Sequence, residues 1–344
     1  MGASDFVHLQ CQSEYSVKNS LIRVSKLIES VQEAGMTSIA LTDDMSLFSA
    51  IKFYQKAFSA GIKPIIGAKI TVTFELGNYD VLLLCQNHEG YLNLSELISK
   101  AYLNEQGISS VSVTEEQLIS HQKGLIMVAT AVSSDIAQLL LSNEHTLAEK
   151  KAIRWKSIFN DRYYISVQRT NRSLDENLLN LTIDLGLQLE IPVVATNDVQ
   201  FLKKNDYEAH EARICIAQGG LLDDARRLKN FSETQYLKTP SEMSDLFSDF
   251  PNILKNTVEL SKRCNLHFEL FEKNYLPVFP TPKGKSISEF FHEESMSGLK
   301  ERLNEISVNE EIYYERLNFE LSVILEMDYP GYFLIVSDFI RWAK

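Results

Sequence analysis

The feature that most constrains the fold is an alternation of short apolar runs and longer amphipathic stretches along residues 6–198. The runs DVLLLC and GLIMVA are typical of buried strands, whereas residues 21–34 and 47–58 carry apolar side chains at helical spacing. This alternation predicts parallel strands covered by helices, and therefore an α/β fold. Seven or eight such units favour a closed (β/α) barrel over an open sheet, although the periodicity allows both.

In a barrel of this kind, the side chains of a site lie at the carboxyl ends of the strands. Four carboxylates, those of Asp43, Asp44, Asp80 and Asp198, occupy such positions, where a closed barrel could bring them together. Hard cations such as Mg²⁺ or Mn²⁺ accept all-oxygen sites. Aspartates at strand ends are also ordinary turn and helix-cap residues, and TDDMS resembles a helix start. A purely structural role for these aspartates therefore also stays open.

The pattern changes after about residue 205, where helical stretches follow one another without strands between them. YLPVFPTPKGK holds three of the eight prolines and is the strongest linker candidate. We therefore predict a first domain over 1–275 (a barrel over about 5–203 and a helical extension over about 204–275), a linker over 276–285 and a truncated domain over 286–344.

Composition and hydropathy argue against a membrane-spanning, a secreted or a nucleic-acid-binding segment. No apolar run approaches the roughly 20 residues that span a bilayer, and the start lacks the charged and apolar segments of a secretory signal. The net charge of -12 argues against this segment gripping nucleic acid by itself, because phosphate backbones are bound by clusters of Lys and Arg. The four cysteines form no CxxC pair, which fits a reducing cytoplasm and argues against disulfides and structural zinc.

No complete catalytic motif is present. A zincin helix, a P-loop and a nucleophile elbow are all absent from the sequence. No two of the seven histidines lie two to four residues apart, so we read them as surface, cap or structural residues. His8 and His210 fall in a strand pattern and a helix pattern, where a satisfied structural role is expected.

Five segments resemble successive motifs of the bacterial DNA polymerase III alpha family, the C-family replicative polymerases. They are HLQCQSEYS, LTDDMSLFSAIKFYQKAFSAGIKPIIGAKI, IPVVATNDVQFLKKNDYEAHEARICIAQG, YLKTPSEM and YERLNFELSVILEMDYPGYFLIVSDFIRWAK. They stand in the family's order and extend to Lys344. The resemblance implies an amino-terminal PHP (polymerase and histidinol phosphatase) domain, a distorted (β/α) barrel that can hold three metal ions, followed by the helical start of the palm.

The departures from the family pattern concern the metal ligands. Only Asp43 and Asp198 keep clear ligand character. The other positions of this vestigial site are Gln10, Gln12, Asn19, Asp44, Lys69, Asp80, Ala131 and Gln200. Amides are weak ligands, Lys69 adds an ammonium group, and the imidazoles and thiolates that transition metals favour are missing. We therefore expect no metal and no cofactor in this fragment, and a buried hydrogen-bond network instead.

The resemblance also implies the wider function. The full-length parent would be an Mg²⁺-dependent DNA-directed DNA polymerase in the cytoplasm, with its catalytic carboxylates beyond Lys344. We assign no catalytic residue here, including Asp328 and Asp338. In the family, degenerate PHP domains bind a separate proofreading exonuclease subunit, so we expect that partner, with DNA reached only through downstream domains and no membrane contact.

Two alternatives remain. In the first, the four aspartates named above retain one Mg²⁺ or Mn²⁺ and hydrolyse pyrophosphate or a phosphoester. In the second, the chain is a free-standing PHP phosphatase of amino-acid metabolism. The second explains the barrel but not the helical region after 205 or the palm-like end.

Overall fold

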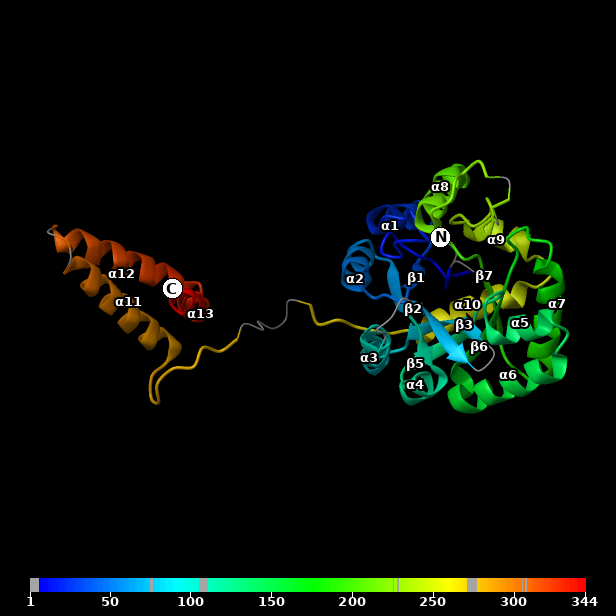
Figure 1. Ribbon diagram of the computed structural model, residues 1–344, viewed down its shortest axis with the longest axis horizontal. Helices are drawn as coiled ribbons and strands as arrows, with labels where there is room; N and C mark the ends of the chain where they lie inside the picture. The colour runs from blue at the N-terminus through cyan, green and yellow to red at the C-terminus, as the bar shows by residue number, and fades with distance from the viewer. Residues whose placement is uncertain are drawn as a thin grey trace. The chain divides into compact units, whose positions relative to one another are not determined.

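The structure is a computed structural model, and it describes residues 6–74, 77–104, 111–224, 226–227, 229–270, 277–304, 306 and 308–344. The chain divides into two compact units, Met1–Phe268 and Glu269–Lys344, which are treated separately below (Figure 1). Residue 5 and the predicted domain boundary at 275–276 lie outside the described residues.

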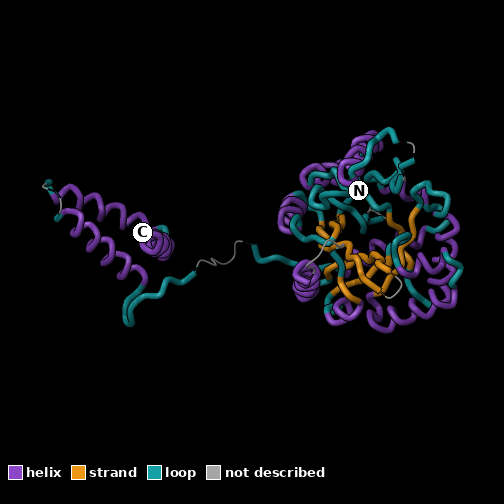
Figure 2. The backbone as a smooth tube through the Cα atoms, viewed as in Figure 1, coloured by secondary structure: helices purple, strands orange, loops and turns teal. Residues whose placement is uncertain are grey.

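The first unit is built on a seven-stranded sheet surrounded by helices (Figure 2). The order is β1-β2-β3-β5-β6-β7, and the short β4 pairs with β2. The strands are β1 (Ser38–Asp44), β2 (Lys63–Phe74), β3 (Gly77–Cys85), β4 (Val113–Thr114), β5 (Leu125–Ala129), β6 (Tyr163–Gln168) and β7 (Val193–Thr196). The predicted α/β class and barrel-type architecture are confirmed, although the strands form a half-barrel: β1 and β7, at the two ends of the strand order, do not pair with each other.

The strand directions correct one expectation. The sheet is mixed, because β3 runs antiparallel to both of its neighbours, β2 and β5, while the other pairs are parallel. Only two residues separate Phe74 from Gly77, and a parallel return needs a crossover of about a dozen residues or more. The segments KPIIG and KITVTF, each of which has a strand pattern of its own in the sequence, form the single strand β2.

Ten α-helices belong to the described part of the first unit, and those in the barrel bury the apolar stripe that the sequence predicts. In α1, for example, Val24, Leu27, Ile28 and Val31 face the core. The helices are α1 (Val24–Glu33), α2 (Ala50–Ser59), α3 (His88–Asn104), α4 (Glu115–Ser120), α5 (Asp135–Leu141), α6 (His145–Phe159), α7 (Asp175–Gln188), α8 (Tyr207–Gln218), α9 (Pro240–Leu246) and α10 (Pro251–Arg263). Two short 3₁₀ helices, Asn160–Arg162 and Lys204–Asp206, complete the unit.

An extended segment, residues 6–12, links the two ends of the sheet. It was predicted as a strand, but only an isolated bridge between Cys11 and Val199 has ladder geometry. On one side the N–H of Ala40 in β1 donates to the carbonyl of His8 at 2.9 Å. On the other side, just after β7, the N–H of Gln12 donates to the carbonyl of Val199 at 3.1 Å. The carboxyl ends of β1 and β7 therefore lie beside the same short segment.

The described part of the second unit contains three helices, α11 (Ile287–Leu303), α12 (Glu310–Glu326) and α13 (Pro330–Ala343). Its small core contains Phe291, Leu321 and Leu334. Several other large apolar side chains are exposed, including Phe339 and Trp342. In the described residues of both units, no helix has the length and apolar character that a membrane span requires.

Candidate functional site

The carboxylate of Asp43, at the end of β1, is buried and fully engaged by hydrogen-bond donors. Oδ1 accepts from the backbone N–H of Ser13 at 2.6 Å and from Ser16 Oγ at 2.7 Å. Oδ2 accepts from Ser13 Oγ at 2.8 Å and from Ser49 Oγ at 2.5 Å. Asp43 is only 1% exposed. Its charge is therefore stabilised by four protein donors, and its oxygens hold the chain before α1 against the start of α2.

The next residue, Asp44, belongs to a separate cluster around Lys69. The ammonium nitrogen of Lys69 lies 3.4 Å from Asp44 Oδ1 and 3.6 Å from Asp80 Oδ2. Asn19 donates its amide N–H to Asp44 Oδ2 at 3.1 Å, and Thr71 donates its hydroxyl to Asp80 Oδ1 at 2.8 Å. The cluster thus joins β1, β2 and β3 through one cation and two carboxylates.

The charge state of Lys69 follows from its surroundings. Burial disfavours the ammonium form, but the carboxylates of Asp80, Asp44 and Asp198 outweigh burial and raise the pKa of Lys69 above its ordinary value. The lysine is therefore a permanent cation at neutral pH.

Asp198 follows β7 and forms a third group with three glutamines. Gln10 and Gln200 each donate an amide N–H to Asp198 Oδ1 at 2.8 Å, and Gln235 donates to Oδ2 at 2.9 Å. Burial raises the pKa of Asp198, although the positive charge of Lys69 partly opposes the rise. The backbone of Asp198 lies in the left-handed region, with φ of 46°, which is uncommon for a residue other than glycine.

The remaining predicted positions contribute little that could act on a substrate. The side-chain oxygens of Gln10, Gln12 and Gln200 are buried and have no hydrogen-bond partner in the described structure. Ala131 is buried and offers no polar side-chain atom. A hollow of about 410 Å³ opens next to Asp44 and Asn19 and is lined by the aromatic rings of Tyr15, Phe48 and Tyr102, among others.

The side chains at the predicted site positions do not fit the metal ions that a PHP barrel is expected to hold. Across the described ranges, no three His, Cys, Asp or Glu side chains are arranged to hold a metal ion. The oxygens of Asp43 already accept four hydrogen bonds, and an ammonium group lies between Asp44 and Asp80. The oxygens of Asp198 accept hydrogen bonds from the amide nitrogens of Gln10, Gln200 and Gln235. The geometry therefore offers a polar network and no open coordination sphere.

Several residues of this network were not anticipated from the sequence. Ser13, Ser16 and Ser49 hold Asp43, and Gln235 connects Asp198 to Arg172, whose Nη2 donates to Gln235 Oε1 at 3.1 Å. Serines are common in turns and helix caps, so the residue type alone did not indicate that these three bind Asp43. Gln235 and Asp198 are 37 positions apart, a contact that periodicity cannot reveal.

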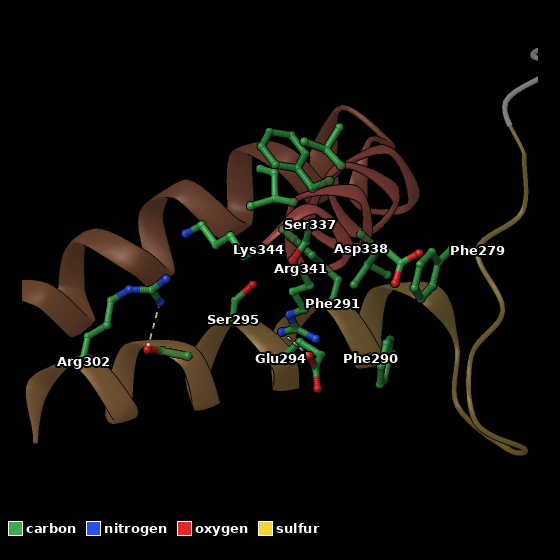
Figure 3. A pocket seen from close by; sticks show the side chains of 15 residues that line it. Phe279, Phe290, Phe291, Glu294, Ser295, Arg302, Ser337, Asp338, Arg341 and Lys344 are labelled. Atoms are coloured by element: carbon green, nitrogen blue, oxygen red, sulfur yellow. Dashed lines mark hydrogen bonds and ion pairs between the residues drawn. The ribbon is translucent and has the colours of Figure 1, made fainter.

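The second unit contains a hollow of about 480 Å³ between α11 and α13 (Figure 3). Phe279, Phe290 and Phe291 contribute an aromatic lining. Of its two carboxylates, that of Glu294 is paired with Arg341 at 2.8 Å, whereas Asp338 lines the wall. Within the described residues, no group of three or more His, Cys, Asp or Glu side chains that could hold a metal ion occurs here either.

Comparison with known proteins relates both units to one class of enzyme. A family model for the PHP domain matches residues 8–170, and a model described as the bacterial DNA polymerase III alpha NTPase domain matches residues 289–344. The chain is 42% identical over 357 aligned residues to "DNA polymerase III subunit alpha" of Pseudomonas fluorescens, covering 99% of this chain and 30% of that protein. It is 38% identical over 354 residues to the Escherichia coli K12 protein of the same name, covering 100% of this chain and 30% of the relative. The chain thus spans under a third of these relatives.

Solved structures give weaker likenesses. An amidohydrolase from Chromobacterium violaceum aligns with a TM-score of 0.42 at 11% identity, over 64% of this chain and 99% of that one. A two-domain protein from Bacteroides vulgatus, described as containing a PHP-like metal-dependent phosphoesterase, aligns with a TM-score of 0.36 at 13% identity, over 73% and 62%. At these scores the likeness supports no argument about function.

Proposed function

Because this chain belongs to the family of bacterial DNA polymerase III alpha subunits, we propose that it is the scaffolding and partner-binding part of a polymerase. The parent would be a cytoplasmic enzyme that carries out DNA-templated DNA synthesis in chromosomal replication and needs Mg²⁺. In this proposal the barrel of the first unit has a structural role, and synthesis depends on residues outside this chain.

The observation that carries the scaffold proposal is the engagement of Asp43. In a metal site, this carboxylate would present lone pairs to a cation. Here it accepts hydrogen bonds from one backbone N–H and three serine hydroxyls, all of them within 2.8 Å. A buried carboxylate with four donors stabilises the local fold, and binding a metal ion would require breaking several of those bonds.

The chain itself is proposed to lack polymerase activity. Nucleotidyl transfer requires carboxylates that hold two metal ions about 4 Å apart. No described residue of the second unit belongs to a group of three or more metal-binding side chains, and the carboxylate of Glu294, which lines the hollow together with Asp338, is paired with Arg341. Contacts with DNA are likewise proposed to lie outside this chain, since its net charge of -12 opposes phosphate binding.

The proposed partner is the proofreading exonuclease subunit of the replicase, which degenerate PHP domains bind. A pull-down tests this directly: the folded chain is immobilised and challenged with the exonuclease subunit of the same organism. Retention of the subunit by the folded chain, and not by the heat-unfolded chain, is the expected result. If the folded chain retains none, with its folding confirmed by circular dichroism, the docking proposal is wrong.

The competing hypothesis is a residual phosphoesterase or pyrophosphatase. It requires hydrolysis of pyrophosphate or an aryl phosphate that depends on Mn²⁺ or Mg²⁺ and disappears in both Asp43→Ala and Asp198→Ala. We expect no such activity in the unmodified chain, because both carboxylates are occupied by protein donors.

A further inference from the structure

We propose that a hollow between the β2–β3 hairpin and α6 binds a small zwitterion, an α-amino acid with a medium-sized apolar side chain. The hollow has a volume of about 330 Å³ and is called the α6 hollow below. Its lining consists of Phe74, Tyr79, Glu115, Asp135, Leu139, Leu147, Lys151 and Arg154. None of these residues belongs to the polar network at the carboxyl ends of the strands, so this binding site is independent of the scaffold proposal.

Part of the lining is apolar. Phe74 and Tyr79 contribute two aromatic rings whose centroids lie 5.6 Å apart, and the buried indole of Trp155 packs edge-on against Phe74 at 6.0 Å. Leu139 of α5 and Leu147 of α6 complete this surface. At about 30 Å³ for each water molecule, the hollow has room for roughly a dozen non-hydrogen atoms. It therefore suits an apolar side chain of the size of leucine or phenylalanine.

The rest of the lining is charged, and its formal charges cancel. Lys151 and Arg154 are the cations, and Glu115 and Asp135 are the anions. Arg154 is paired with Glu115, and the ammonium nitrogen of Lys151 lies 3.7 Å from Glu115 Oε2 and 5.0 Å from the centre of the Phe74 ring. A ligand with a single charge would leave one of the lining charges unbalanced, whereas a zwitterion brings one charge of each sign.

The two carboxylates can accept an ammonium group. Glu115 Oε1 is buried and, apart from its ion pair with Arg154, accepts no hydrogen bond within the described structure. Buried polar atoms normally have a hydrogen-bond partner, so a donor is missing here. Asp135 accepts one hydrogen bond at each oxygen, from the N–H of Ile136 at 2.8 Å and from Trp155 Nε1 at 3.0 Å, which leaves a lone pair on each. Burial raises the pKa of Asp135, and a nearby ammonium group would favour its ionised form.

The two cations can hold a carboxylate. The side chain of Arg154 is 52% exposed, so it reaches the rim of the hollow, whereas Lys151 is 24% exposed and lies deeper. A guanidinium group has five N–H donors, and a single carboxylate such as that of Glu115 does not use all of them. The rim therefore has donors left for the carboxylate of a ligand whose side chain packs on Phe74.

Isothermal titration of the full chain with L-phenylalanine tests the proposal. We expect one binding site with a Kd of about 0.1–1 mM, as is usual for a ligand of this size. At ten times the Kd, the melting temperature of the first unit should rise by roughly 3 °C. The emission of Trp155 should change on binding, because its indole bonds to Asp135, while Trp342 in the second unit gives a constant background.

The two halves of the ligand test its chemical class. 3-Phenylpropanoate lacks the ammonium group, and 2-phenylethylamine lacks the carboxylate. Each should bind at least about tenfold more weakly than phenylalanine, because one pair of lining charges then has no counterpart. If either half binds as tightly as phenylalanine, the zwitterion assignment is wrong.

Matched variants locate the site. Arg154→Met removes the rim cation and should weaken phenylalanine binding at least about tenfold without weakening 2-phenylethylamine. Leu147→Trp places a large ring in the hollow and should abolish binding. Lys150→Met, at an exposed position of the same helix outside the hollow, controls for the loss of one positive charge and should leave the Kd unchanged.

Each outcome supports or overturns the amino-acid site without touching the scaffold proposal, since no metal ion and no exonuclease subunit takes part. Absence of both heat and a melting shift with phenylalanine up to about 10 mM overturns it. If Leu147→Trp folds and binds phenylalanine as the unmodified chain does, the ligand binds elsewhere and the proposal is wrong. If Leu147→Trp does not fold, Arg154→Met decides, because Arg154 is an exposed residue.

Discussion

Replacing Asp43 by alanine should strongly destabilise the first unit. The change leaves the backbone N–H of Ser13 and three serine hydroxyls without their acceptor in a place where Asp43 is 1% exposed. The hydroxyls can rotate toward other acceptors, but the backbone N–H cannot. Hydrogen bonds to charged groups contribute about 1.5–3 kcal/mol each and do not add, so we expect the free energy of unfolding to fall by about 3–5 kcal/mol.

Urea unfolding followed by tryptophan fluorescence measures this loss. Trp155 is buried in the first unit whereas Trp342 is 90% exposed, so the change in emission comes mainly from the barrel. Asp43→Asn keeps the shape of the side chain but replaces one acceptor oxygen by a donor, and it should lower the free energy of unfolding by about 1–3 kcal/mol. Asp184→Ala, at an exposed position on α7, is the control and should stay within about 0.5 kcal/mol of the unmodified chain. A loss below about 1 kcal/mol in Asp43→Ala would contradict a structural role for this carboxylate.

Two further perturbations test the fold of the first unit. Burial lowers the pKa of His8 to about 4, so His8 stays neutral in the folded state, whereas the unfolded chain protonates it below pH 6.5. The free energy of unfolding should therefore fall by up to about 3 kcal/mol between pH 6.5 and pH 4. In urea titrations, His8→Gln should flatten that part of the pH profile. In Gly90→Ala, the new Cβ would lie 1.9 Å from the carbonyl oxygen of Gly124, so we expect the free energy of unfolding to fall by about 3 kcal/mol or more and the melting temperature by about 10 °C. Gly220→Ala is the control and should be nearly neutral, because no atom lies within 4 Å of its new Cβ. Equal melting temperatures for the two variants would contradict the close approach of α3 to the loop before β5.

The sequence predicted the elements of the barrel better than their directions. The runs that form β3 and β5 were found because their apolar residues are continuous, and α1 was found because its stripe has helical spacing. The direction of β3 was missed because periodicity is the same in parallel and antiparallel strands. Its only signal was the short connection after β2, which rules out a crossover.

The site was predicted as a set of positions but not as a set of partners. Asp43 and Asp44 were grouped together, yet consecutive residues of a strand point to opposite faces, and here they join different networks. Alternation along the strand could have separated them. The contacts of Asp198 with Gln10 and Gln235 could not be predicted, since they span 188 and 37 positions and depend on how the barrel closes.

The segment at residues 6–12 has a consequence for the order of folding. Its backbone N–H at Val7 donates to the hydroxyl of Thr257, 250 positions later, and the side chain of His8 bonds to the carbonyl of Lys238. At a synthesis rate of about 5–20 residues per second, the ribosome needs roughly 10–50 s to deliver those partners. The first part of the barrel to leave the ribosome is therefore among the last to be fixed in place, and until then β1 and β7 keep open edges that can pair with other chains.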